Sequence, residues 1–297
     1  DYDGTASSLL VEPQRTNLLT YSEDLSQWNL KQATETLNYG ISPDGTQNST
    51  RLVFASDNLQ FSNTLSTGSI TSGSIFVKGI SGETITFGLK NAESQFTFNG
   101  LWQRLEMQGA ATTNNKITIN TYSGVTARDL EVWGAQLEEG SYATSYIPTD
   151  GSTVTRVQDQ YSKTGISNLI NSEEGVLFVE MAFSDDGRLA ILNSDASDDQ
   201  VVLGFSGSVF CRIRENGTNV VTQFVSSANQ LNTYYKIAVK YKSGSSAIWV
   251  DGNETVVAGT FTLNDLSKIL FISEGSRTYG KVKQLQIYKT TDIDLAA

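Results

Sequence analysis

The stretch SAIWVDGNETVV, Ser246 to Val257, indicates the fold class of this chain of 297 residues. Ile248 and Val250 fall on one side of a two-residue alternation, and Trp249 falls on the other. This period is typical of a β-strand that is buried on one face. The Asp-Gly pair after Val250 favours a type I′ turn, because both central residues of that turn need a positive φ. The stretch therefore predicts an antiparallel hairpin.

The same alternation recurs along the whole chain. It is clear in ETITFGLK, residues 83–90, and in NKITINTY, residues 115–122, and Gly- and Ser-rich turn clusters separate such runs. No helical periodicity extends beyond about two turns, so the crossover helices that a parallel sheet needs are absent from the pattern. A chain of this length suits two domains of ordinary size. We therefore predict an all-β fold with two antiparallel β-sandwich (jelly-roll) domains in tandem.

Composition shifts divide the chain into four predicted segments. The first is an N-terminal extension whose apolar patch Leu9–Val11 is short enough to be an added edge strand. A polar stretch with short apolar islands separates the two sandwiches, as a connector would. The strand GVLFVEMAF, residues 175–183, is apolar on both phases and predicts a central strand covered on both faces. The predicted boundaries are extension 1–16, first jelly roll 17–148, linker 149–173 and second sandwich 174–297.

The composition excludes several classes of function. The chain has no histidine and one cysteine, Cys211, so it lacks a Ser-His-Asp triad, a histidine-based zinc site and an internal disulfide. Cys211 lies in the strand-like SVFCRIR and is predicted to be a small buried hydrophobe rather than a nucleophile. The net charge of −11 repels phosphate backbones. No run reaches the roughly 18 apolar residues of a membrane span, so neither nucleic acid nor membrane insertion is expected.

Paired carboxylates are the remaining route to hydrolysis of a glycan. Asp129 and Glu131 alternate on one strand, where a solvated strand face is the simpler interpretation, and Glu180 is the single acid of its strand. We predict no catalytic residues and a protein that is not an enzyme. A chain that itself cleaves a polysaccharide, through Glu180 or Asp129, is the alternative.

Aromatic side chains offer a route to glycan binding without catalysis, because their faces stack on sugar rings while polar groups match hydroxyls. Trp102 shares a phase with Arg104, opposite Leu105. Trp249 lies opposite the apolar phase of its strand, and one of the adjacent Tyr234 and Tyr235 must be exposed. Packing in the sandwich core is the competing interpretation of each aromatic ring. The predicted glycan-binding residues are Trp102, Arg104, Trp249 and Tyr235.

The predicted metal ligands are three acidic residues of the first domain. The first and last strands of a jelly roll lie side by side, so Glu23 or Asp24 could meet Asp129, and hard cations prefer clustered oxygens. No cofactor is required for the predicted role, and a structural Ca²⁺ ion is the one candidate.

Several segments between Leu9 and Arg156 resemble, in order and spacing, a recurrent module of tailed-phage appendage proteins. They are LLVEPQRTNLLTYSEDLSQWN, SPDGTQNSTRLV, SIFVKG, LWQRLE and LEVWGAQLEEGSYATSYIPTDGSTVTR. The resemblance implies a carbohydrate-binding-module-like jelly roll with a cation near Glu23, Asp24 and Asp129. It also implies that Tyr142, Tyr146 and Pro148 anchor the chain where it leaves the domain.

Residues 175–293 resemble, more distantly, a concanavalin A-like, laminin-G-type sandwich, on YYKIAVKYKSGSSAIWVDGNETV and GKVKQLQIYKTTDIDL. Together the resemblances imply a non-enzymatic structural protein on the virion surface, a phage fibre or capsid-surface appendage, that binds host-surface or environmental glycans. Other virion proteins and copies of itself are the expected partners. A homotrimer is the expected assembly if the connector's apolar islands, Val154, Val157 and Ile166 to Ile170, pack on a neighbouring copy. The alternative is a pair of carbohydrate-binding modules from a bacterial polysaccharide-degrading enzyme.

Overall fold

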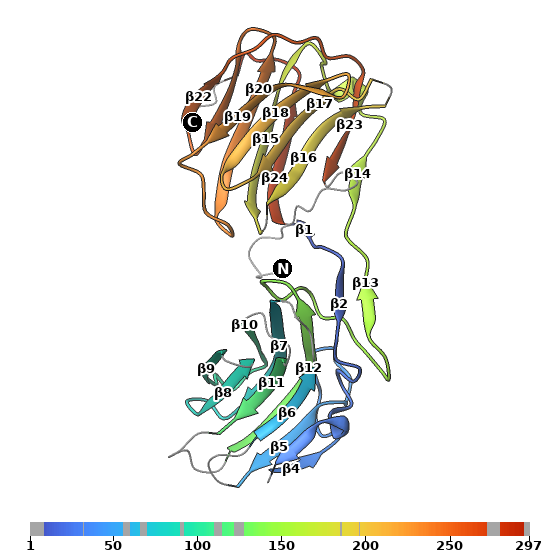
Figure 1. Ribbon diagram of the computed structural model, residues 1–297, viewed down its shortest axis with the longest axis vertical. Coiled ribbons are helices and arrows are strands. Elements are labelled where there is room, and N and C mark those ends of the chain that lie inside the picture. The colour runs from blue at the N-terminus through green and yellow to red at the C-terminus, as the bar shows by residue number, and fades with distance from the viewer. Residues whose placement is uncertain are drawn as a thin grey trace. The chain divides into compact units, whose positions relative to one another are not determined.

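The computed structural model describes residues 9–31, 33–55, 60–65, 70–89, 92–109, 115–121, 128–184, 186–195, 197–271 and 280–293 (Figure 1). These residues form antiparallel strands and two short 3-10 helices, η1 (Leu25–Gln27) and η2 (Ser167–Leu169), which confirms the predicted fold class. None of the helices in this part of the chain is long and apolar enough to cross a membrane. The chain divides into two compact units: the jelly-roll unit, Gln14–Val157, and the second sandwich, Asp1–Pro13 with Gln158–Ala297.

The described residues of the jelly-roll unit form two five-stranded sheets and a two-stranded ladder. One sheet has the order β10-β7-β12-β5-β4, with β10 (Gln103–Gly109), β7 (Thr71–Gly79), β12 (Arg128–Glu139), β5 (Thr50–Phe54) and β4 (Ala33–Thr36). The other has the order β3-β6-β11-β8-β9, with β3 (Asn29–Lys31), β6 (Gln60–Leu65), β11 (Asn115–Asn120), β8 (Thr84–Leu89) and β9 (Ala92–Thr97). The ladder pairs β2 (Arg15–Asn17) with β13 (Val154–Arg156).

The core of the jelly-roll unit lies between its two sheets. Ile85, Phe87 and Leu89 of β8 are all buried, as their shared phase predicted. They belong to one apolar cluster with Leu105 of β10 and Val132 of β12 from the other sheet. Alternation along each strand therefore leaves the opposite phase of β7, β10 and β12 on the outer face of their sheet.

In the second sandwich, the residues that the structure describes form two six-stranded sheets. The first sheet has the strand order β1-β24-β15-β20-β21-β22, with β1 (Leu9–Val11), β24 (Gly280–Tyr288), β15 (Glu174–Phe183), β20 (Tyr234–Lys242), β21 (Ser246–Val250) and β22 (Asn253–Val257). The outer face of this sheet carries the candidate site. The other has the order β14-β23-β16-β17-β18-β19, with β14 (Tyr161–Lys163), β23 (Leu266–Phe271), β16 (Gly187–Ser194), β17 (Gln200–Phe205), β18 (Val209–Glu215) and β19 (Thr218–Val225). The rings of Phe183 and Phe205 meet between the sheets with centroids 5.4 Å apart.

Three local predictions are confirmed in the second sandwich. The turn between β21 and β22 has positive φ at both central residues, 49° at Asp251 and 80° at Gly252, as a type I′ turn requires. Leu9–Val11 is an edge strand, paired antiparallel with β24 (Figure 1). Cys211 is buried, and this burial raises the pKa of its thiol to about 12.

Strand β15 departs from its prediction on one face. Val176, Val179 and Met181 are buried, but Phe178 and Glu180 are only half-buried because they line a cavity on the outer face of the sheet. The strand is central in its sheet, as expected, but its outward phase is only partly covered, because Val176 is buried there while Phe178 and Glu180 are not. The apolar residue Phe178 was therefore predicted to be covered, but it lies on a partly open surface.

The segment predicted as a linker contributes a strand to each unit. Its β13 pairs with β2 in the jelly-roll unit, and its β14 pairs with β23 in the second sandwich. Ile166 and Ile170 are buried within the second sandwich, so these two side chains are not free to pack on another copy. Val157 and Leu169, which are 73% and 53% exposed, remain accessible.

Candidate functional site

A cavity of about 310 Å³ lies on the outer face of the sheet that contains β15. It is formed by side chains of the outward phase, because successive residues of a strand point to opposite faces. Strands far apart in sequence supply them, together with the turn after β21 and one residue beyond β24. The lining residues are Phe178, Glu180, Lys236, Ala238, Trp249, Gly252, Gln284, Gln286, Tyr288 and Ile293.

The floor of the cavity follows one cross-strand row. Phe178 of β15 lies directly opposite Gln286 of β24 on one side and Ala238 of β20 on the other. Ala238 in turn lies opposite Trp249 of β21. The small alanine therefore separates two aromatic side chains, and the sheet is hollowed between them. A half-buried tryptophan beside such a hollow presents an apolar surface that suits the C–H face of a sugar ring.

Polar groups occupy the adjacent row. Glu180 lies opposite Lys236 on β20 and Gln284 on β24. The carboxylate of Glu180 pairs with the ammonium of Lys283, at 3.6 Å, although Lys236 is its cross-strand neighbour. Within the described residues the Lys236 ammonium has no ion-pair partner, so it is available to a ligand.

The Tyr288 hydroxyl orients a further polar group of the cavity. It donates a hydrogen bond to Oε1 of Gln286, so the amide oxygen is occupied and the amide NH₂ remains to donate. The cavity thus combines an aromatic surface with two uncommitted donors and one carboxylate. A single carboxylate in the lining differs from the facing pair of acids that glycoside hydrolysis uses.

The structure brings one of the four predicted glycan-binding residues, Trp249, to this cavity. Tyr235 points the other way: it is 6% exposed, and its hydroxyl accepts a hydrogen bond from the backbone N–H of Gln230. Its ring is therefore not available for stacking, which corrects the prediction. Tyr234 has the outward phase instead, and the Lys283 ammonium lies 3.9 Å from the centroid of its ring.

Trp102 lies in the jelly-roll unit, next to a sheet face that carries the charged side chains of Lys78, Glu131 and Arg51. Its indole N–H donates to the carbonyl of Ile41, at 3.1 Å, and the ammonium of Lys78 lies 6.0 Å from its ring centroid. Glu131 lies opposite both Lys78 and Arg51 and pairs with Lys78 at 3.1 Å. The Trp102 ring is half-buried at the border of this face, so its predicted role in stacking remains a prediction.

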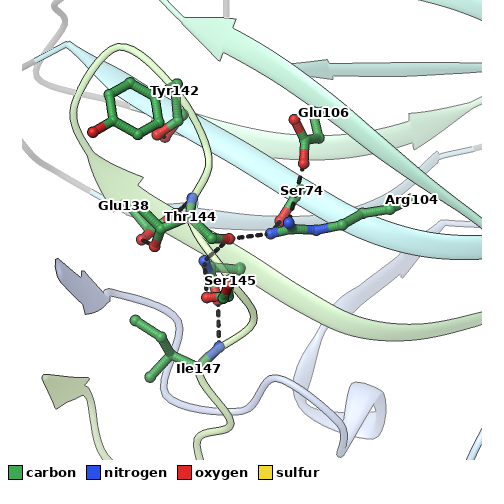
Figure 2. Close-up of polar contacts among 10 residues, drawn as sticks. Ser74, Arg104, Glu106, Glu138, Tyr142, Thr144, Ser145 and Ile147 are labelled. Carbon is green, nitrogen blue, oxygen red and sulfur yellow. Dashed lines mark hydrogen bonds and ion pairs between the residues drawn. The ribbon is translucent and has the colours of Figure 1, made fainter. Parts of the chain in front are cut away.

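Arg104 holds the segment that leaves the jelly-roll unit. Its guanidinium donates to the carbonyl of Thr144, at 2.5 Å, and to the hydroxyl of Ser74, and it pairs with Glu106 at 3.1 Å (Figure 2). Only 22% of its side chain is exposed. These contacts show that Arg104 anchors the exit segment, and its predicted role in glycan binding remains a prediction.

The exit segment is also held by buried polar side chains of β12. Gln136 accepts from the backbone N–H of Ile147 at 2.6 Å. Glu138 accepts from the backbone N–H of Thr144 at 2.8 Å (Figure 2). Tyr146 packs its ring on Trp133, with centroids 4.6 Å apart, and donates to Glu23. Tyr146 thus anchors the exit as the resemblance implied, whereas Pro148 is exposed.

The three predicted metal ligands do not come together. Glu23 and Asp24 line one cavity of about 370 Å³ with Pro148, Thr149 and Asp150. Asp129 is instead bound by Arg51 through two hydrogen bonds, at 2.8 and 2.5 Å. This contact lowers the pKa of Asp129. Among the residues that the structure describes, no cluster of three or more acidic or cysteine side chains could hold a metal ion.

Sequence reasoning missed most of the cavity around Trp249. Phe178 was assigned to a covered face, and Lys236, Gln284 and Gln286 were not singled out. The signal was present in QLQIY, residues 284–288, where polar residues and a tyrosine take the outward phase of β24. Only the strand order shows that this phase faces the same side as Trp249.

Comparison with known proteins gives structural neighbours alone. No protein-family model matches the chain, and no curated protein matches it. The mouse laminin alpha1 chain, domains LG4-5, aligns at 9% identity over 97% of this chain and 93% of that one, with a TM-score of 0.32. The CBM22-1-CBM22-2 tandem domain of Paenibacillus barcinonensis Xyn10C aligns at 10% identity over 96% and 100%, with a TM-score of 0.33. A truncated AlyQ with CBM32 and alginate lyase domains aligns at 11% identity over 89% and 98%, with a TM-score of 0.29. These similarities are too low to define the fold, so the two sandwiches are defined by their strand pairing.

Proposed function

We propose that this chain is a non-enzymatic, glycan-binding structural protein of a phage virion appendage. The observation that carries the binding function is the Trp249 cavity, where an aromatic side chain, an amide donor and a free ammonium converge on one hollow. The virion setting is supported by the resemblance of Leu9 to Arg156 to phage appendage modules. The protein would then lie on the virion surface, outside the cell.

A cavity of about 310 Å³ on a sheet face suits weak recognition of one sugar unit in a longer chain. Many copies on one particle would then supply avidity, because linked sites bind a polymer far more tightly than a single site does. Val157 and Leu169 are exposed apolar side chains through which copies could associate, and a homotrimer remains the proposed assembly. A pair of binding modules from a polysaccharide-degrading enzyme would use the same cavity, and its catalytic segment would lie elsewhere in the longer chain.

The test of the binding function is a glycan array probed with the protein displayed on multivalent beads. We expect hits for the wild type and their loss for Trp249→Ala, with partial retention for Trp249→Phe because an aromatic face remains. Phe224→Ala is the matched control, since Phe224 is an exposed aromatic residue of the other sheet in the same unit. An array without hits, or equal losses for the Trp249 and Phe224 variants, would contradict the proposal.

A further inference from the structure

The sheet that carries the Trp249 cavity is basic in an acidic protein. Its six strands contain five lysines and three glutamates, a net charge of +2, whereas the whole chain has a net charge of −11. The lysines are Lys236, Lys240, Lys242, Lys281 and Lys283, and the glutamates are Glu174, Glu180 and Glu254. Charges farther away than about 8 Å are largely screened at physiological salt. A ligand in the cavity therefore responds to this sheet more than to the overall charge.

Ion pairs within the sheet leave one lysine of the cavity uncommitted. Lys242 pairs with Glu174 at 2.6 Å, and Lys283 pairs with Glu180 at 3.6 Å. Lys240 donates to the hydroxyl of Ser245 at 3.3 Å. Lys236 lines the cavity, and its ammonium has no ion-pair partner among the described residues, although its backbone N–H donates to the carboxylate of Asp251, at 2.9 Å. The one carboxylate in the lining, that of Glu180, is already neutralised by Lys283.

The Gln286 amide adds a second donor to that of Lys236. Because Tyr288 occupies its Oε1, the amide offers its NH₂ to a ligand. An ammonium and an amide NH₂ beside an aromatic surface match a sugar ring that carries an acceptor with a negative charge. A neutral sugar would leave the ammonium without a charged partner in the complex.

We propose that the Trp249 cavity binds a sugar unit that carries a carboxylate, a hexuronic acid, with the carboxylate on Lys236 and the ring beside Trp249. The inference rests on the proposed glycan-binding function and adds the class of sugar. The amide of Gln286 donates to the same carboxylate or to a neighbouring hydroxyl.

The experiment compares an oligogalacturonate with the same oligosaccharide in which the carboxylates are methyl-esterified, by calorimetry with the full chain. We expect the acid to bind the wild type and the ester to bind roughly tenfold more weakly, as loss of one charge-assisted hydrogen bond implies. Lys236→Gln should remove the preference for the acid, and Lys236→Arg should retain it. Lys240→Gln removes the same charge from the same strand, outside the cavity lining, and should leave the preference intact.

The outcomes separate the inference from the proposed function. Equal binding of acid and ester that is lost in Trp249→Ala would overturn the uronic acid assignment and leave a neutral-glycan site. Equal effects of Lys236→Gln and Lys240→Gln would also overturn it, because the preference would then reflect general charge. Absence of binding to the acid, the ester and every glycan of the array would remove the binding function itself.

Discussion

Gln136 and Ile147 are joined by a buried hydrogen bond in which the backbone N–H of Ile147 donates to Oε1 of Gln136, at 2.6 Å. The Gln136 amide also donates to the carbonyls of Thr144 and Ser145. One side chain on β12 thereby satisfies three backbone groups of the exit segment. Because this segment has no ladder of its own at these residues, its conformation depends on side chains of β12 and on Arg104.

Gln136→Ala is expected to destabilise the jelly-roll unit. The substitution leaves the buried backbone N–H of Ile147 without its partner, whereas the Thr144 carbonyl keeps its hydrogen bond from Arg104. A buried group without a partner costs about 1–3 kcal/mol. Urea unfolding followed by tryptophan fluorescence reports on this unit, since Trp28, Trp102 and Trp133 lie in it. Gln95→Ala is the control, because the Gln95 side chain is exposed and its amide donates to the hydroxyl of Thr84. If Gln136→Ala lowered the free energy of unfolding no more than Gln95→Ala does, the anchoring role of Gln136 would be refuted.

Local structure was predicted well from the sequence, because strands and turns depend on residues that are neighbours along the chain. The Asp251-Gly252 turn, the edge strand Leu9–Val11 and the burial of Leu105 all follow from alternation and turn chemistry. The cavity could not be predicted in the same way, since Glu180, Trp249 and Gln286 meet only through the order of four strands. Arg104 has the outward phase of a binding residue, and only the folded exit segment shows that Thr144 occupies its guanidinium.

The turn between β21 and β22 gives a graded prediction. At a φ of 80°, Gly252 adopts a conformation that costs an L-residue about 1–2 kcal/mol. Asn tolerates this region better than Ala, and a β-branched residue tolerates it least. Thermal unfolding of the second sandwich should therefore show losses that increase from Gly252→Asn to Gly252→Ala to Gly252→Val. Equal melting temperatures across the three variants would mean that the turn is not type I′.

The ion pair of Arg51 and Asp129 predicts a dependence of stability on pH. The hydrogen bond from Arg51 lowers the pKa of Asp129 in the folded protein. A lowered folded pKa means that the pair contributes stability above the unfolded pKa, near 4, and that this contribution is lost as the pH falls through the folded value. The difference in unfolding free energy between the wild type and Asp129→Asn should thus be present at about pH 6 and shrink toward about pH 2–3. The pair is partly exposed, so the difference is expected to be under about 1 kcal/mol.

Glu254→Gln provides the comparison for this titration. Glu254 is exposed in the second sandwich, and its substitution removes the same charge from the chain. Its effect on the free energy of unfolding should be close to zero both at about pH 6 and at about pH 2–3. If Asp129→Asn showed a difference that grew as the pH fell, the pair would not be the source of the effect.

Tyr288→Phe tests whether the hydroxyl of Tyr288 orients the Gln286 amide. Removing the hydroxyl frees Oε1 of Gln286, so the amide can rotate and no longer presents its NH₂ to the cavity. We expect affinity for the acidic oligosaccharide to fall roughly two- to tenfold, the effect of weakening one hydrogen bond. Because the ring is kept and the hydroxyl lies in a half-buried position, the melting temperature should change little.

Gln286→Leu removes the donor itself and should reduce affinity at least as much as Tyr288→Phe does. A double variant of Gln286→Leu with Tyr288→Phe should lose no more affinity than Gln286→Leu alone. Additive losses in the double variant would show that Tyr288 contacts the ligand independently of Gln286.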